Sequence, residues 1–260
     1  MNAAKFPDLV TCLTGDQPPR VWSLLVTVFG ELAQKHGTQI SGTLLRHLSE
    51  LIGYKPEAVR VALHRLRKDG WIESKRQGRN SDYCLTDWGR TQSAEASPRI
   101  YAKGSLADRA WLVVLEPGTG SAEEMGQGAW LTSNVFLSSR PVTNDDAFVV
   151  PVDNAAQLPD WMRTKLCGED IAESAKKLTK ALSELETQSA ILDHLTPCER
   201  AVVRLLVVHD WRRIVLKSPV LPDFVFPEDC PLPHCRAMVA RTLRRLPAQS
   251  LDVLEQSLAD

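Results

Sequence analysis

Residues 56–86 constrain the fold of this chain more than any other stretch. They read PEAVRVALHRLRKDGWIESKRQGRNSDYCLT. Pro56 suits a first helical turn, where its missing N–H needs no partner, and Gly70 suits the position just after a helix. Between the two, apolar residues repeat at helical spacing and form one stripe, made of Val59, Ala62, Leu63 and Leu66. The pattern predicts a short amphipathic helix that ends at Gly70.

Positive charge covers the rest of that helix and the segment that follows it. Opposite the apolar stripe lie Glu57, Val61, His64 and Lys68, with Arg60, Arg65 and Arg67 on the flanks. Two strand-like runs, 71–74 and 82–85, then enclose a basic turn at 75–80. A helix sized for the major groove followed by a cationic hairpin is typical of a winged helix-turn-helix. The sequence therefore predicts a DNA-binding domain.

The formal net charge of −1 conceals an asymmetry along the chain. Residues 55–80 contain eight Lys or Arg and three acidic residues, whereas residues 116–173 contain three basic and ten acidic residues. A surface for phosphates is therefore expected to be local and near the N-terminus, and the acidic middle is expected to face solvent, a protein or a ligand.

Helical patterns on both sides complete the predicted DNA-binding domain. Residues 20–36 form one expected helix, and Ser41 is the expected N-cap of a second that Gly53 ends. A further helix is expected at 86–96, so that the domain spans 20–97. Residues 1–19 are expected to be poorly structured.

Two further modules are predicted, which makes the fold class α+β. After a linker around 97–105, strand-like runs with one or two helices on one face predict an α+β module at 106–155; the runs are 111–115, 134–137 and 147–152. Helical periodicity predicts a module at 160–260, with helices at 168–185, 198–216 and 234–246 and a proline-rich loop at 219–233.

Composition predicts a cytoplasmic protein. No apolar run approaches the roughly eighteen residues of a membrane span, and the first residues lack the basic start and apolar block of a secretion signal. The six cysteines include no C-x-x-C pair, which favours reduced thiols.

One cluster of metal-ligand residue types stands out. Cys230, His234 and Cys235 are close in sequence and could bind zinc if His209 or Cys198 joined them. The prolines at 230–235 favour an irregular or extended segment. Ordinary buried thiols are the expectation, so we predict neither a metal nor a cofactor.

Four blocks of the sequence resemble the PaaX-type family, the transcriptional repressors of bacterial phenylacetic-acid degradation. They are SLLVTVFG at 23–30, AVRVALHRL at 58–66 with KDGW at 68–71, Gly78-Arg79 leading into Leu85-Thr86, and VVHDWRR at 207–213 followed by KSP at 217–219 and LP at 221–222. The resemblance covers most of the chain. It implies a winged helix-turn-helix, a ferredoxin-like middle domain similar to a CRISPR-associated nuclease fold, and a helical C-terminal domain for effector binding and dimerisation. It also implies a homodimer on a palindromic DNA operator, released by phenylacetyl-CoA or another aryl- or acyl-CoA.

The predicted DNA-binding residues fall into two roles. Arg60 and His64, in the first two helical turns, are expected to reach base edges, where Arg offers guanine a bidentate match. Phosphate contacts are expected from the last turn and the hairpin, namely from Arg67, Lys68, Lys75, Arg76 and Arg79. Arg65 and Asn80 complete the predicted DNA-binding set. The alternative is an ordinary solvated charged helix beside a surface hairpin.

A second candidate site combines cations with an aromatic face. Its residues are Arg204, His209, Trp211, Arg212 and Arg213. Arginines suit the phosphates of a CoA ester, and a tryptophan suits its adenine. The alternative is that Trp211 belongs to the core while Arg212 and Arg213 pair with the acidic middle segment.

Two other classes of function compete with a regulator. A metal-dependent nuclease would use carboxylates near the first strand of the middle module, where Asp108 and Glu116 are the candidates. A protein adaptor would use the acidic face. No Walker loop, dinucleotide fingerprint, G-x-S-x-G or H-E-x-x-H is present. We therefore predict a non-enzymatic, effector-responsive repressor of a catabolic operon.

Overall fold

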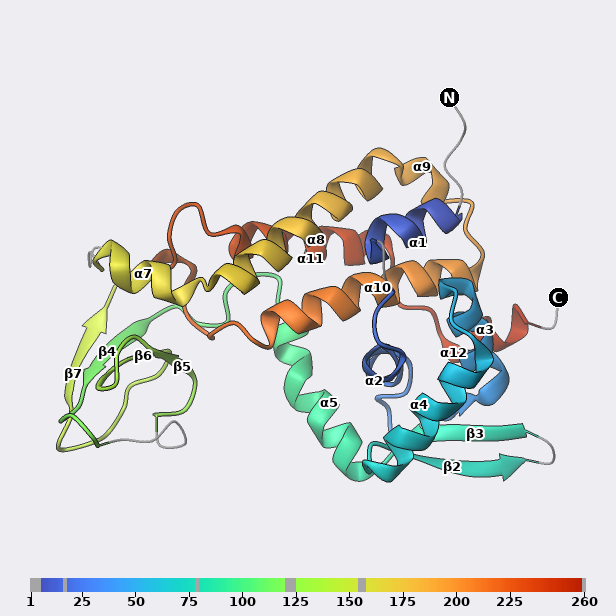
Figure 1. Ribbon diagram of the computed structural model, residues 1–260, viewed down its shortest axis with the longest axis horizontal. Coiled ribbons are helices and arrows are strands. Elements are labelled where there is room, and N and C mark those ends of the chain that lie inside the picture. Colours follow the sequence, from blue (N-terminus) through green and yellow to red (C-terminus); the bar gives the residue numbers. More distant parts are fainter. Residues whose placement is uncertain (1–5, 16–17, 78–79, 120–124, 154–157, 259–260) are drawn as a thin grey trace. The chain divides into compact units, whose positions relative to one another are not determined.

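The computed structural model describes residues 6–15, 18–77, 80–119, 125–153 and 158–258, and the protein is of the α+β class (Figure 1). Contacts between Cα atoms divide the chain into two compact units. Unit 1 comprises residues 1–100, 180–212 and 239–260, and unit 2 comprises residues 101–179 and 213–238. No helix of the described ranges has the length and apolar character needed to cross a membrane.

Helices and a small antiparallel sheet alternate in the first segment of unit 1. The elements are α1 (Phe6–Thr14), α2 (Val21–Leu32), β1 (Ile40–Ser41), α3 (Gly42–Ile52), α4 (Pro56–Lys68), β2 (Ile72–Gln77), β3 (Asn80–Leu85) and α5 (Asp87–Ile100). The strand order is β1-β3-β2. Residues 24–29 of α2 are all buried, as expected for a helix in the middle of a core. Figure 1 shows α2 end-on, with α4 and α5 beside it.

Local sequence signals explain where α3 and α4 begin and end. Ser41 accepts a hydrogen bond from the Leu44 N–H at 3.0 Å, which confirms it as the N-cap of α3. Gly53 and Gly70 follow the two helices with φ of 96° and 76°, conformations that glycine adopts without strain. After α4, Trp71 N–H donates to Leu66 O and Gly70 N–H donates to Arg67 O, which is the Schellman arrangement. The predicted ends of both helices are thus confirmed.

The C-terminal helices complete the core of unit 1. They are α8 (Glu169–Thr187), α9 (Ser189–Leu192), α10 (Pro197–Val215), α11 (Pro231–Arg245) and α12 (Leu251–Gln256), and the unit boundary falls within α8, α10 and α11. Within unit 1, the Trp211 indole donates to Ile100 O at 2.9 Å, and Ser41 donates to the Glu255 carboxylate. The predicted module at 160–260 therefore contributes to both units, and the three-module division stays a prediction.

Unit 2 contains a four-stranded antiparallel sheet. Its elements are β4 (Ala110–Val114), β5 (Gly128–Trp130), β6 (Val135–Ser138), β7 (Phe148–Val152), α7 (Asp160–Leu166) and a 3-10 turn, η1 (Asp223–Val225). The strand order is β5-β6-β4-β7. Val113 pairs with Phe136 on one side and Val149 on the other, and its side chain packs with Leu115 and Met125. The stretch between β6 and β7, described throughout, contains no helix.

The prediction of a poorly structured start was wrong for residues 6–14, which form α1. Its residues Leu9, Val10 and Leu13 are buried. A helix this short is not stable by itself in water, so packing of these side chains stabilises it. Cys12 Sγ lies 3.7 Å from Ala181 O of α8, which places α1 on that helix within unit 1.

Two predicted breaks at proline were also wrong. The helix α5 passes through Pro98 and ends at Ile100. Two contacts fix this last turn, because Ile100 is buried and its carbonyl accepts a hydrogen bond from the Trp211 indole. The helix α11 begins at Pro231 where an extended segment was expected. Pro231 and Pro233 lie in its first turn, where the missing N–H groups have no helical partner to lose.

Gly89, in the first turn of α5, allows that helix to approach closely the backbone of Trp71, the residue before β2. A Cβ at Gly89 would lie 2.2 Å from the carbonyl oxygen of Trp71, a backbone atom. We expect Gly89→Ala to lower the free energy of unfolding by about 1–3 kcal/mol, because either the helix or the strand must shift. Urea unfolding of the full chain measures this.

Gly30→Ala in α2 is the matched control. A Cβ at Gly30 would make an ordinary contact of 3.8 Å with Ser93 Oγ, and alanine is the better helix former by about 1 kcal/mol. We expect this variant to be as stable as the parent or more stable. Equal losses in both variants would show that the close approach at Gly89 has no special role.

Candidate nucleic-acid interface

The α4 helix separates an apolar face from a charged one. Its predicted stripe, Val59, Ala62, Leu63 and Leu66, is buried against the core. The remaining residues from 57 to 68 are exposed, including the predicted base-reading residues Arg60 and His64. The other predicted DNA-binding residues of this helix, Arg65, Arg67 and Lys68, are exposed as well. Burial of the stripe fixes the helix, and the cations are left at the surface.

Intrahelical pairs hold some of these cations. Arg60 lies 3.3 Å from the Glu57 carboxylate, and Arg65 lies 3.5 Å from that of Asp69. The Arg65 guanidinium also lies 5.3 Å from the centre of the Trp22 ring of α2. Exposed pairs of this kind contribute little stability and can be exchanged for other partners. The Trp22 contact makes Arg65 the more restrained of the two arginines.

The hairpin that follows is longer than predicted. Its strands extend to Gln77 and from Asn80, beyond the expected 71–74 and 82–85, because the pairing continues through Lys75 with Asp82 and Arg76 with Ser81. Lys75 and Arg76 are exposed. As neighbours in a strand they point to opposite faces of the ribbon. Arg79 lies outside the described residues, and of Asn80 only the backbone is described.

A set of hydrogen bonds joins the helix, the hairpin and α5. Thr86 Oγ1 donates to Gly70 O at 2.6 Å and accepts from the Gly89 N–H at 3.0 Å, so one side chain caps α5 and binds the turn after α4. Arg90 donates to Leu85 O at 3.0 Å. The rings of Trp71 and Trp88 meet edge to face with centroids 4.9 Å apart. The cations of α4 and those of the hairpin are therefore positioned by the same set of hydrogen bonds and ring contacts.

The turn between α3 and α4 is anchored from outside. The Tyr54 hydroxyl donates to Pro19 O at 2.5 Å. Burial, and to a lesser extent the Asp210 charge, raise the pKa of Tyr54, so the hydroxyl stays protonated as a donor. In the hairpin, Cys84 donates to the Glu73 carboxylate, and burial followed by that bond raises the pKa of the thiol.

The structure places the second predicted site largely inside unit 1. Trp211 is 0% exposed, so its ring offers no face to an adenine. His209 is equally buried, with Nδ1 3.2 Å from Thr27 Oγ1, and Arg212 donates to Ser23 O. Of the five predicted residues, Arg213 is the exposed one.

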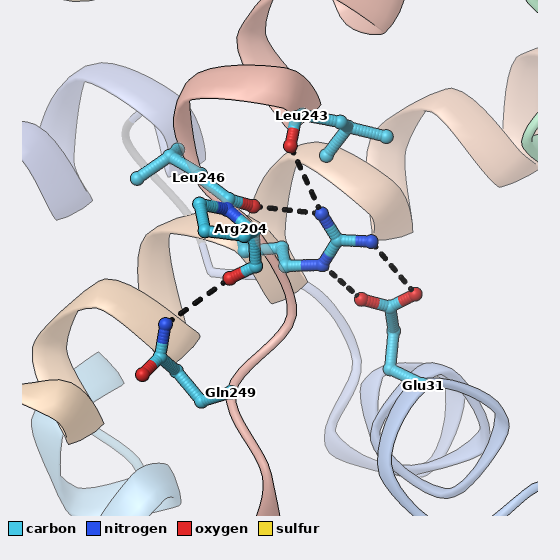
Figure 2. A network of polar contacts seen from close by, with 6 residues as sticks. Glu31, Arg204, Leu243, Leu246 and Gln249 are labelled. Carbon is cyan, nitrogen blue, oxygen red and sulfur yellow. Dashed lines mark hydrogen bonds and ion pairs between the residues drawn. The ribbon is translucent and has the colours of Figure 1, made fainter.

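Arg204 belongs to a buried polar network that the sequence did not reveal (Figure 2). Its guanidinium pairs with the Glu31 carboxylate of α2, and their side chains are 12% and 5% exposed. The same group donates to Leu246 O at 2.7 Å and Leu243 O at 3.3 Å, near the end of α11. Arg204 therefore joins α2, α10 and α11 within unit 1.

The residues considered for metal binding and for nuclease chemistry do not assemble. Within the described ranges, no group of three or more His, Cys, Asp or Glu side chains could hold a metal ion. Asp108 and Glu116 are exposed. His234 is exposed, whereas Cys230 hydrogen-bonds with the Cys167 thiol, which lowers the pKa of Cys230 to about 7.

Comparison with known proteins points to one family. A model described as "PaaX-like protein" matches residues 20–89, and one described as "PaaX-like protein C-terminal domain" matches residues 167–256. The transcriptional repressor PaaX of Escherichia coli (strain K12) is 29% identical over 234 residues, which cover 79% of this chain and 73% of that protein. Among solved structures, the uncharacterised protein Rv0674 from Mycobacterium tuberculosis is 18% identical, with a TM-score of 0.49, over 90% of this chain and 97% of its own.

Proposed function

Since this chain belongs to the PaaX-like protein family, we propose that it is a sequence-specific DNA-binding transcriptional regulator, acting as a repressor. The observation that carries the proposal is that the same hydrogen bonds position the exposed cations of α4 and those of the β2–β3 hairpin. The E. coli relative is named a transcriptional repressor, which agrees with this function.

The element order of unit 1 supports a winged helix-turn-helix as the DNA-binding fold. We assign α3 and α4 as the helix pair, with α4 as the recognition helix, and the β2–β3 hairpin as the wing. Arg60 and His64 would reach base edges in the major groove. The phosphates would be bound by Arg65, Arg67, Lys68, Lys75, Arg76, Arg79 and Asn80. Under this assignment the charged face of α4 binds DNA and is more than an ordinary solvated helix surface.

We assign unit 2 a ferredoxin-like sheet as its fold. The antiparallel order β5-β6-β4-β7, with the first strand of the set inside the sheet, supports this assignment. The missing helix between β6 and β7 marks a departure from the full pattern. The proposal does not extend to nuclease chemistry, because no three or more His, Cys, Asp or Glu side chains of the described residues come together to hold a metal ion.

Regulation would follow from two copies binding one palindrome. In a dimer the two recognition helices must lie about one DNA turn, or a multiple of it, apart. An effector that prefers an arrangement with another spacing lowers operator affinity by its differential affinity for that arrangement. Phenylacetyl-CoA or another aryl- or acyl-CoA is the proposed effector, and the regulated genes would form a catabolic operon.

Arg213 offers the direct test of the effector assignment, since it is the exposed member of the predicted set. If that set contacts a CoA phosphate, Arg213→Ala should weaken phenylacetyl-CoA binding by about tenfold, as expected for the loss of one charge-assisted hydrogen bond. Isothermal titration of the full chain measures the affinity. An unchanged value would place the effector elsewhere.

Selection from a random pool of DNA duplexes tests the function itself. We expect the full-length protein to enrich a palindromic sequence, and the double variant Arg60→Ala/His64→Ala to lose the enrichment while it retains non-specific binding through the phosphates. Lys180→Ala, on α8 with its side chain 81% exposed, is the matched control and should enrich the same sequence. A pool that stays random with the parent protein would refute the proposal.

A further inference from the structure

Val61 is the most exposed large apolar side chain of the described residues. Its exposed fraction is 70%, in the middle of α4. Valine is a weaker helix former than alanine, leucine or lysine, because its branched side chain loses freedom against the preceding turn. In the free protein, this residue therefore has neither core burial nor helix propensity in its favour.

The surroundings of Val61 are polar. On the helix surface its neighbours three and four positions away are Glu57, Ala58, His64 and Arg65, all exposed. Ala58 is the one other apolar side chain among them. A protein partner needs a contiguous apolar patch with a polar rim, and two small side chains among charges do not form one. The residue lies instead between the two predicted base-reading residues, Arg60 and His64.

We propose that Val61 reads thymine, by packing against its C5-methyl group in the major groove. The inference rests on the proposed function and assigns one position of the operator. The methyl of thymine is the apolar group that base pairs present in the major groove, where the other edges offer hydrogen-bond donors and acceptors. Val61 lies in the second turn of α4, within the half of a recognition helix that reaches base edges.

The shape of valine suits this contact. Branching at Cβ restricts χ1, so the two methyl groups have a fixed direction before DNA arrives and little rotamer freedom is lost on binding. The main chain of α4 is itself fixed by its buried stripe and its Schellman end. Val61 can therefore distinguish thymine from cytosine, whose pair lacks the methyl group at this place.

Uracil scanning of the selected operator tests the inference. Each thymine is replaced singly by deoxyuridine, which removes the C5-methyl and leaves the Watson–Crick edge unchanged. We expect one thymine in each half-site at which the replacement weakens binding of the parent protein by about fourfold, and by about sixteenfold when both half-sites are changed; fourfold corresponds to about 0.8 kcal/mol for one buried methyl-sized group. Fluorescence anisotropy of the full chain measures the affinities.

Val61→Ala completes a double-mutant cycle. This variant should bind the thymine and uracil operators with equal affinity. Its thermal stability should equal or slightly exceed that of the parent, because Val61 is exposed and alanine is the better helix former. If no thymine shows the penalty, or if the penalty persists in Val61→Ala, the inference is wrong while the proposed function stands. If the parent protein enriches no sequence at all, both fail together.

Discussion

Arg204→Ala is expected to lower the free energy of unfolding by about 3–5 kcal/mol, the usual effect of breaking a buried ion pair from one side. The variant leaves the Glu31 carboxylate, 5% exposed, without this cation, and it leaves the carbonyls of Leu243 and Leu246 without this donor. Glu31→Gln should lose less, because a neutral amide can still accept a hydrogen bond from Arg204. Urea unfolding of the full chain at neutral pH measures both variants.

Arg241→Ala is the matched control for that experiment. Arg241 forms a similar close pair with Glu186, but the two side chains are 48% and 32% exposed. Water and salt screen such a pair, so the unfolding midpoint should stay close to that of the parent. If the two arginine variants changed the midpoint equally, burial would not be what gives the Arg204 network its strength.

Removal of the hairpin cations is expected to weaken binding to every DNA sequence. At about 0.9 counterions released per phosphate contact, Lys75→Ala/Arg76→Ala should reduce the slope of log affinity against log salt by about 1.8. At 0.1 M salt this corresponds to a loss on the order of fiftyfold, alike for the selected operator and for a scrambled duplex. Salt titrations monitored by fluorescence anisotropy give both numbers.

Lys180→Ala serves as the comparison outside the hairpin, since it removes an exposed lysine from another part of unit 1. Its salt slope should equal that of the parent. A hairpin variant with an unaltered slope would show that β2 and β3 do not contact phosphates, and the assignment of this hairpin as a wing would then be withdrawn.

Local signals in the sequence were sufficient for the helices α3 and α4 of the proposed DNA-binding region. Pro56, the stripe from Val59 to Leu66, and Gly70 each act within one or two helical turns, so the bounds of α4 follow from the sequence. The same holds for Ser41 as a cap. The hairpin length was underestimated, because polar residues such as Lys75 and Arg76 lack strand propensity and are held in β2 by pairing with β3.

Contacts between segments that are distant in sequence could not be predicted from such local signals. Arg204 and Glu31 are 173 positions apart, and no spacing rule joins α10 to α2. Trp211 had two interpretations from the sequence, a ligand contact and a core residue, and the structure buries it with its indole bonded to Ile100 O. Trp211 follows a largely apolar run at 202–208 in the same helix, and that pattern is itself a signal of burial.

The predicted helix breaks at two prolines were wrong for a related reason. Pro231 and Pro98 interrupt a helix in the average protein, but Pro231 occupies a first turn, and the end of α5 beyond Pro98 is fixed by a tertiary hydrogen bond. The sequence predicts the cost of a proline, and the fold decides whether other contacts offset that cost.

The ratio of two affinities tests the central proposal most directly. The full-length protein is titrated with the selected palindrome and with a scrambled duplex of the same composition, at about 0.15 M salt. A sequence-specific regulator should bind the palindrome at least about a thousandfold more tightly. Equal affinity of the folded protein for the two duplexes would contradict the proposal, whether the protein is a monomer or a dimer.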